Sequence, residues 1–361
     1  MHTASSKYKV SSVLEALNII TRGRVVMNWR EISENSNPYV VTKTSHIPGK
    51  SVIEIPGLVF GNMEKTITKL GVVMTMTESV IELASAMGIE LLVVHHPVAE
   101  AANSGGVPFT NYLPLYDIAI IELHEAFHGL HPGITFIHGH RVQKTDTCFG
   151  GIHGNVLHVG KALDEIKTAG DIIRRLDHFI GRNIERALLL SEREVRSADC
   201  IEETTVANSA LLLNGDLDSP VKNILHFFPH TGFNTEHLYH ALSLYPETDT
   251  LIASISRVRS THPLVQEAKR LGLTFIVGNP HSVEILENGM PLAYALDYLL
   301  PGLDVYVLRE RVTATPLQQM GHQEIQVYGQ EIALGYLIPA GMKDPVRLGG
   351  DEIKSNLLWL K

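Results

Sequence analysis

Two adjacent histidines, His95 and His96, stand directly after the apolar run Leu91–Val94 and before Pro97. Imidazole is a common ligand for divalent metals, and in open α/β sheets ligands bind beyond the carboxyl ends of strands. Pro97 restricts His96 to extended backbone, which splays the two rings. We therefore predict that each ring serves a different metal ion, or that one ring binds while the other orients it. A buried histidine pair without metal is the alternative.

A second donor pair lies late in the chain, where His281 and Glu284 follow the apolar run Leu273–Val277. A spacing of three residues lets both side chains reach one ion from a loop or a first helical turn. Glu284 could also bridge two ions, because a carboxylate has two oxygens. A helix-capping or surface role for Glu284 is the alternative interpretation.

The stretch from His124 through Glu125 to His128 matches the H-E-x-x-H pattern of zinc peptidases. That chemistry needs both histidines on one helix face, so the peptidase hypothesis predicts a helix over residues 118–130. The apolar run Ile118–Ile121 favours a strand instead. A strand would also place His124 and His128 on one face, which suits a metal pocket.

Histidines are numerous and clustered in this chain. There are 19 of them, and nine lie within residues 95–158. The only cysteines, Cys148 and Cys200, exclude a disulfide framework and a cysteine-rich zinc site. A histidine and carboxylate donor set suits one or two divalent ions such as zinc, iron, manganese or nickel. A pH-sensitive surface is the alternative explanation of the histidine content.

The charge balance argues against several classes of partner. The net charge is −9, and no Lys/Arg cluster marks a nucleic-acid or anionic-membrane surface. No apolar run approaches the roughly 18–20 residues of a membrane helix, and Met1 to Val10 lacks the apolar core of a signal peptide. We therefore expect a reduced, cytoplasmic protein that acts on a small molecule.

A glycine-rich stretch, Gly150-Gly-Ile-His-Gly154, could approach a phosphate or a substrate closely. It matches neither the Walker pattern nor the G-x-G-x-x-G fingerprint. We interpret it as a flexible loop.

The donor residues follow two stretches with the same organisation of elements. Each has a helix, a glycine, a buried strand and a histidine-bearing loop. The helices are predicted over Val80–Met87 and Leu264–Leu271, and the strands over Ile89–Val94 and Leu273–Val277. Alternating helices and strands indicate α/β layers around a largely parallel sheet.

Polar residues predict where the helices begin. Thr75 and Glu78 fit a capping box ahead of the first helix. Thr261 precedes the second helix and has Pro263 near its first turn. Thr168 is expected to cap a further helix between them.

The chain is predicted to contain an N-terminal extension, a metal-binding core and a C-terminal extension with β-like pieces. Their ranges are 1–50, 51–311 and 312–361. The core is expected to hold two similar lobes, roughly 51–160 with 271–311, and 161–270. The β-like pieces of the tail are Ile325–Tyr328 and Glu331–Ile338.

At these motifs the chain resembles the YbgI-like dinuclear-metal proteins, the type 2 GTP cyclohydrolase I homologues. Gly57-Leu-Val-Phe-Gly61 looks like that family's early G-L-x-x-G stretch, and Glu82–Pro97 is similar to its helix, strand and H-H-P motif. Asp117–His128 resembles the following strand with its H-x-x-x-D motif, and Arg257–Glu284 resembles the late segment with a His and a Glu. The resemblance covers roughly residues 50–311.

The resemblance implies a three-layer α/β/α fold with largely parallel or mixed sheets, a toroidal homo-hexamer, and two metals facing an internal cavity. It also implies hydrolytic opening of a purine nucleotide. The metal ligands carried over are His95, His96, His128, His281 and Glu284, with His124 at the position of the family's nearby histidine.

Two positions depart from the family pattern. His128 stands where the family has a bridging Asp, and neutral imidazole has one lone pair, so it cannot bridge two ions. Glu284 is then the evident bridge. The spacing between His281 and Glu284 is three residues where the family has four.

Our leading hypothesis is a metal-dependent hydrolase-like enzyme that attacks its substrate with a metal-activated water. His124 would orient a ligand or shuttle protons, and Glu284 would serve both metal and catalysis. A non-enzymatic metal-binding, regulatory or metallochaperone protein is the second hypothesis, and the H-E-x-x-H zinc peptidase is the third.

Overall fold

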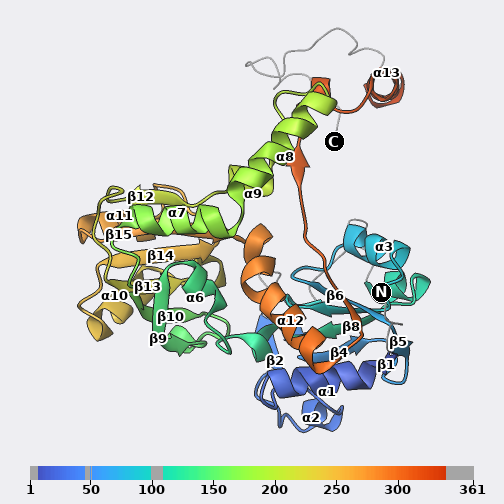
Figure 1. The fold of residues 1–361 in the computed structure, drawn as a ribbon, viewed down its shortest axis with the longest axis horizontal. Helices are drawn as coiled ribbons and strands as arrows, with labels where there is room; N and C mark the ends of the chain where they lie inside the picture. The colour runs from blue at the N-terminus through green and yellow to red at the C-terminus, as the bar shows by residue number, and fades with distance from the viewer. Residues whose placement is uncertain (1–6, 45–48, 50, 99–108, 339–361) are drawn as a thin grey trace. The chain divides into compact units, whose positions relative to one another are not determined.

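Two helix-covered β-sheets form the main unit of this computed structural model, which describes residues 7–44, 49, 51–98 and 109–338 (Figure 1). That unit comprises Met1–Glu185 with Thr204–Val312. A smaller unit comprises Arg186–Glu203 with Thr313–Lys361. Within the described residues, no helix has both the length and the apolar character that crossing a membrane requires.

The first sheet has five strands in the order β16-β6-β7-β8-β4. Four of them run parallel, and β4 is antiparallel to β8. Their bounds are β4 (Gly57–Phe60), β6 (Lys69–Val73), β7 (Leu91–Val94), β8 (Ala119–Glu122) and β16 (Asp304–Val307).

Residues of β7 alternate between the two faces of this sheet, and both faces are covered. Leu91 packs in one core cluster with Leu14 of α1 and Leu296 of α12, whereas Leu92 packs in another with Ile81 of α3. This three-layer packing explains why β7 is apolar throughout. The helices are α1 (Val10–Ile20), α3 (Glu78–Ala86) and α12 (Met290–Leu299).

The second sheet has six strands in the order β12-β15-β14-β13-β10-β9. Strands β13, β14 and β15 are parallel, and the other three pair antiparallel. The bounds are β9 (His140–Asp146), β10 (Leu157–Ala162), β12 (Leu211–Asn214), β13 (Asn223–Phe227), β14 (Thr250–Ile255) and β15 (Thr274–Pro280).

Helices also cover both faces of the second sheet. Leu238 of α10 and Leu264 of α11 share a core cluster with Phe275, while Ile172 of α7 shares another with Ile276. The predicted three-layer α/β fold is therefore confirmed in both sheets. The helices are α7 (Ala169–Phe179), α10 (Thr235–Leu244) and α11 (Pro263–Arg270).

The membership of the sheets differs from the predicted lobes. The residues of β9, β10 and β15 lie wholly or mostly within the range predicted for the first lobe, but all three strands belong to the second sheet. Helix α1 also lies in the core of the first sheet, so residues 1–50 are not simply an extension. Strand order along the chain does not reveal such long-range pairing, because β10 pairs with β13, from Lys161 with Asn223 to Leu157 with Phe227.

Two of the three predicted helix starts differ by one or two residues. Thr168 caps α7 in a capping box with Asp171, as expected. Helix α3, however, is capped by Thr77, and α11 by His262, whose side chain accepts from the amide of Leu264. Thr75 therefore does not cap the helix, and its side chain contacts His96 instead.

The tail differs most from expectation. The predicted strands Ile325–Tyr328 and Glu331–Ile338 are wrong, because α13 (Gln323–Ile332) and the π-helical turn Ala333–Leu337 occupy these residues. Ile325, Tyr328 and Ile332 recur at helical spacing, which was the better signal. Residues 339–361, part of the predicted β-rich tail, lie outside the described residues.

Candidate metal centre

His95 and His96 lie where β7 ends, at the carboxyl edge of the first sheet. Their amides donate to Val73 and Met74 at 3.0 and 2.8 Å, so the backbone continues the pairing with the β6 side. The two rings converge on one carboxylate: the Nε2 of His95 lies 3.5 Å from Glu284 Oε1, and the Nε2 of His96 lies 3.1 Å from Glu284 Oε2. The two rings therefore belong to one site around Glu284.

Glu284 reaches this point from the second sheet. Strand β15 leads into the short 3-10 turn η4 (His281–Val283), and Glu284 follows it at 3% exposure. Asn288 donates to its Oε1 at 3.0 Å. Burial acts to raise the pKa of Glu284, but the His96 hydrogen bond and the neighbouring imidazoles outweigh it, so the pKa lies well below its usual range. Glu284 is therefore a carboxylate with an imidazole at each oxygen.

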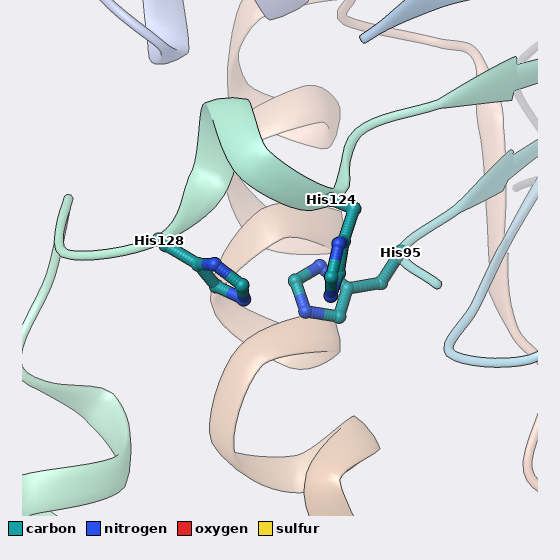
Figure 2. A group of neighbouring side chains, drawn as sticks. All are labelled: His95, His124 and His128. Carbon is teal, nitrogen blue, oxygen red and sulfur yellow. The ribbon is translucent and has the colours of Figure 1, made fainter. Parts of the chain in front are cut away.

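His124 begins the helical turn α5 (His124–Phe127), which follows β8, and His128 comes directly after that turn. Their ring centroids are 4.6 Å apart. Figure 2 shows both rings turned towards His95, whose centroid lies 5.3 Å from that of His124 and 5.6 Å from that of His128. The turn α5 thus brings two imidazoles next to the ring of His95, which follows β7.

The local structure corrects two interpretations of this segment. The strand predicted at its start is present as β8, but residues 124–127 are helical, so the extended path through His128 is wrong. The helix over residues 118–130 that the peptidase hypothesis requires is not formed either, because β8 occupies 119–122.

Within the described residues, three groups of side chains have donor atoms that all lie within 4.8 Å of one another. His95 takes part in two groups, and His124 also takes part in two. The groups are His95 with His124 and His128; His95 with His96 and Glu284; and Glu54 with His124 and Glu125. Four of the predicted ligands, His95, His96, His128 and Glu284, therefore meet in one place together with the predicted His124.

His281, also predicted as a ligand, lies beside this centre but in none of the three groups. Its ring centroid is 5.3 Å from that of His96 and 4.7 Å from that of His230. Burial lowers the pKa of His281 to about 4, so its ring is neutral at pH 7. This neutral ring next to His96 can therefore still bind a metal ion through its lone pair, or it can line the cavity.

Two of the contacts that hold the imidazoles could not be predicted from the sequence. Thr75, expected as a helix cap, has its Oγ1 2.6 Å from the Nδ1 of His96. Glu54, at the end of β3 (Ser51–Glu54), accepts from the Nδ1 of His124 at 2.8 Å. Both lie far from their partners in sequence, so no local motif pairs them.

A cavity of about 1240 Å³ opens over this centre and is lined by residues that follow strands of both sheets. Gly151 to Gly154 contribute to its wall, so the glycine-rich loop does approach the space where a substrate would lie. That loop is closed at its base, since the backbone amide of Phe149 donates to the Asn155 carbonyl and the side-chain amide of Asn155 donates to the Phe149 carbonyl. Our interpretation of it as merely flexible therefore missed its position.

A second set of histidines is buried within the six-stranded sheet. His140 Nε2 and His226 Nδ1 are 3.0 Å apart, and the His138 and His226 ring centroids are 4.6 Å apart. His158 joins this set and also lines the cavity. Burial lowers the pKa of His138 to about 4 and of His158 to about 3, and those of His140 and His226 well below the usual range.

The donor set of the main centre fits a divalent ion. Imidazole nitrogens and carboxylate oxygens suit zinc and related first-row metals. The Nδ1 atom of His95 is buried and makes no hydrogen bond within the part of the chain that the structure describes. Buried polar atoms of this kind are costly unless a ligand or an ion satisfies them. Buried His and Glu groups could thus bind a metal ion here.

Comparison with known proteins agrees with this picture. Residues 40–104 match the family Duf34/NIF3 (NGG1p interacting factor 3). No curated protein sequence matches the chain.

Several solved structures share the fold. Reduced HcgD from Methanocaldococcus jannaschii is 14% identical, with a TM-score of 0.54 over 84% of this chain and 99% of that chain. The ybgI protein, of unknown function, is 13% identical, with a TM-score of 0.51 over 83% and 98%. A Bacillus cereus protein related to NIF3 is 11% identical, with a TM-score of 0.50 over 85% and 98%. The family match over residues 40–104 and the shared fold together confirm the predicted resemblance to the YbgI-like proteins.

Proposed function

We propose that this protein is a metal-dependent hydrolase-like enzyme acting on a small molecule, of the nucleotide or purine class that the resemblance implies. The observation that carries the proposal is the convergence of His95, His96 and Glu284 at the floor of a large cavity. The two histidines follow β7 and the glutamate follows β15, so the centre lies at the carboxyl ends of strands from both sheets.

A divalent ion held there would act as a Lewis acid and lower the pKa of a coordinated water. Glu284 presents one oxygen to each of the two adjacent imidazoles, so it can also contact two ions at once. His124 lies beside this group and supplies either a further ligand or a route for protons. The cavity of about 1240 Å³ is large enough for a nucleotide-sized substrate.

The first test is metal-dependent turnover. Purified protein is analysed for bound metal and assayed on a panel of purine nucleotides, nucleosides and bases, with and without chelator. We expect turnover that disappears on chelation, returns on adding metal, and falls at least about 100-fold in His96→Ala. His178→Ala, an exposed position on α7, is the matched histidine control and should keep full activity. Turnover that survives chelation would rule the proposal out.

A non-enzymatic metal-binding, regulatory or metallochaperone protein is the second candidate. The observation that favours it is His128, which stands where the family's bridging Asp is expected. Tight, stoichiometric metal binding without turnover across the whole panel would support this candidate over the enzyme.

His128→Asp tests how many ions the centre holds. A carboxylate at this position offers two oxygens, so the variant is expected to bind a second ion that the parent binds weakly. Elemental analysis after dialysis at equal metal activity should show the metal content per chain rising by about one ion. An unchanged content would show that residue 128 does not set the number of ions.

We also propose, from the resemblance, that the protein is a homo-oligomer and specifically a hexamer, and, from its two cysteines, that it is cytoplasmic. Sedimentation equilibrium of the metal-loaded protein tests the assembly. A monomer at micromolar concentration would contradict it.

A further inference from the structure

Two buried glutamates lie close to the histidines at the two ends of α5. Glu54 Oε2 lies 2.8 Å from the Nδ1 of His124, which is the length of an N–H···O hydrogen bond. Glu125 Oε1 lies 3.7 Å from the same nitrogen. Both glutamates are almost fully buried, at 3% and 7% exposure. Their carboxylates therefore face His124 in a poorly hydrated environment, where a charged hydrogen bond is strong.

Glu125 faces the second histidine as well. Its Oε2 lies 3.6 Å from the Nδ1 of His128, which is buried and makes no hydrogen bond within the described part of the chain. The two oxygens of Glu125 are thus divided between the two rings. A small rotation of the His128 ring would bring its Nδ1 within hydrogen-bond distance.

The position of these carboxylates determines which nitrogen can bind metal. A neutral imidazole carries one N–H and one lone pair, and a carboxylate at Nδ1 keeps the proton there. The lone pair is then on Nε2. Since donor atoms of His95, His124 and His128 already lie within 4.8 Å of one another, Nε2 is the nitrogen left to serve that group.

We propose that Glu54 and Glu125 are positioning residues that hold His124 and His128 as Nε2 metal ligands. This inference rests on the proposed metal binding and deepens it, because it assigns His124 to the ion rather than to proton transfer. It also accounts physically for the absence of the family's bridging Asp. The negative charge is supplied instead by Glu54 and Glu125, which lie beside the imidazoles rather than among the metal ligands.

The same residues allow one competing arrangement. Glu54, His124 and Glu125 themselves form a donor group, in which His124 would bind through Nδ1. The two arrangements require opposite protonation of the His124 ring, so they can be distinguished directly. Two observations favour the positioning role. Glu54 lies at hydrogen-bond distance, 2.8 Å, from the Nδ1 of His124, and Glu125 turns one oxygen towards His124 and the other towards His128.

The experiment compares Glu54→Gln with the parent protein in zinc titrations against a chelating competitor. Glutamine keeps the shape but removes the charge, so we expect about 10- to 100-fold weaker zinc binding. Glu125→Gln should act in the same direction. Glu122→Gln is the matched control, because Glu122 is equally buried on β8 but accepts from the backbone amides of Ile55 and Val98. Its zinc affinity should match the parent's.

A second readout does not depend on affinity. In the zinc-loaded, ¹⁵N-histidine-labelled parent, we expect His124 and His128 to keep Nδ1–H and to bind through Nε2. Coordination of His124 through Nδ1, or parental zinc affinity in folded Glu54→Gln, would overturn the inference. Thermal unfolding of the metal-free variants checks that they fold. A parent that binds no zinc would instead refute the proposed function itself.

Discussion

Replacing Glu284 by glutamine is expected to remove most metal binding, with the largest effect of any single change at the centre. The carboxylate lies between the Nε2 atoms of His95 and His96 and carries the negative charge that faces both. Glutamine keeps the shape but offers one neutral oxygen, so we expect at least about 100-fold weaker zinc affinity and loss of any metal-dependent turnover. Competitive titration and elemental analysis measure the change.

Glu287→Gln provides a matched control in the same segment. Glu287 is three residues further on and equally buried, and its Oε1 accepts from Asn279 at 2.7 Å. Burial raises the pKa of Glu287 to about 8, so the side chain is mostly neutral at pH 7 and glutamine replaces it with little electrostatic change. Equal losses in both variants would mean that the Glu284 effect is structural rather than metal binding.

The buried histidines of the six-stranded sheet should make the metal-free protein sensitive to mild acid. His138, His140, His158 and His226 have depressed pKa values in the folded state because they are buried. The unfolded chain takes up protons near pH 6.5 and the folded chain does not, so stability is present above that pH and falls as the pH falls. From pH 7 to 5 we expect a loss of about 2 kcal/mol for each ring that stays neutral.

Urea unfolding in the presence of chelator at pH 7, 6 and 5 measures this loss. Replacing His158 by asparagine should reduce the number of protons taken up on unfolding by about one, and with it the slope of the unfolding free energy against pH. Replacing the exposed His178 by alanine should leave that dependence unchanged. A pH dependence that is equal in all three proteins would show that the buried rings do not cause it.

Much of the first sheet and about half of the metal centre could be predicted from the sequence. The apolar run at β7 predicted a strand covered on both faces, and the packing of Leu91 and Leu92 into different clusters confirms it. His95 and His96 could be found because they directly follow that strand. Glu284 could be linked to them because parallel strands in α/β folds present their carboxyl ends to ligands.

The remaining parts depended on contacts with no local signal. Glu54 contacts His124 across 70 residues of sequence, and nothing about its position at the end of the short strand β3 marks it as a partner. The path of residues 124–128 was also ambiguous, because five residues are too few to show a helical or strand period and fit a strand and a single helical turn equally well. Which of the two forms is decided by tertiary packing.

The distance along the chain between the ligands has a consequence for biosynthesis. His96 and Glu284 contact each other but are 188 residues apart in sequence. A growing polypeptide emerging from the ribosome therefore presents the first imidazoles long before their carboxylate partner exists. Tight capture of an ion has to wait until nearly all of the main unit has been translated, so metal supply matters after synthesis rather than during it.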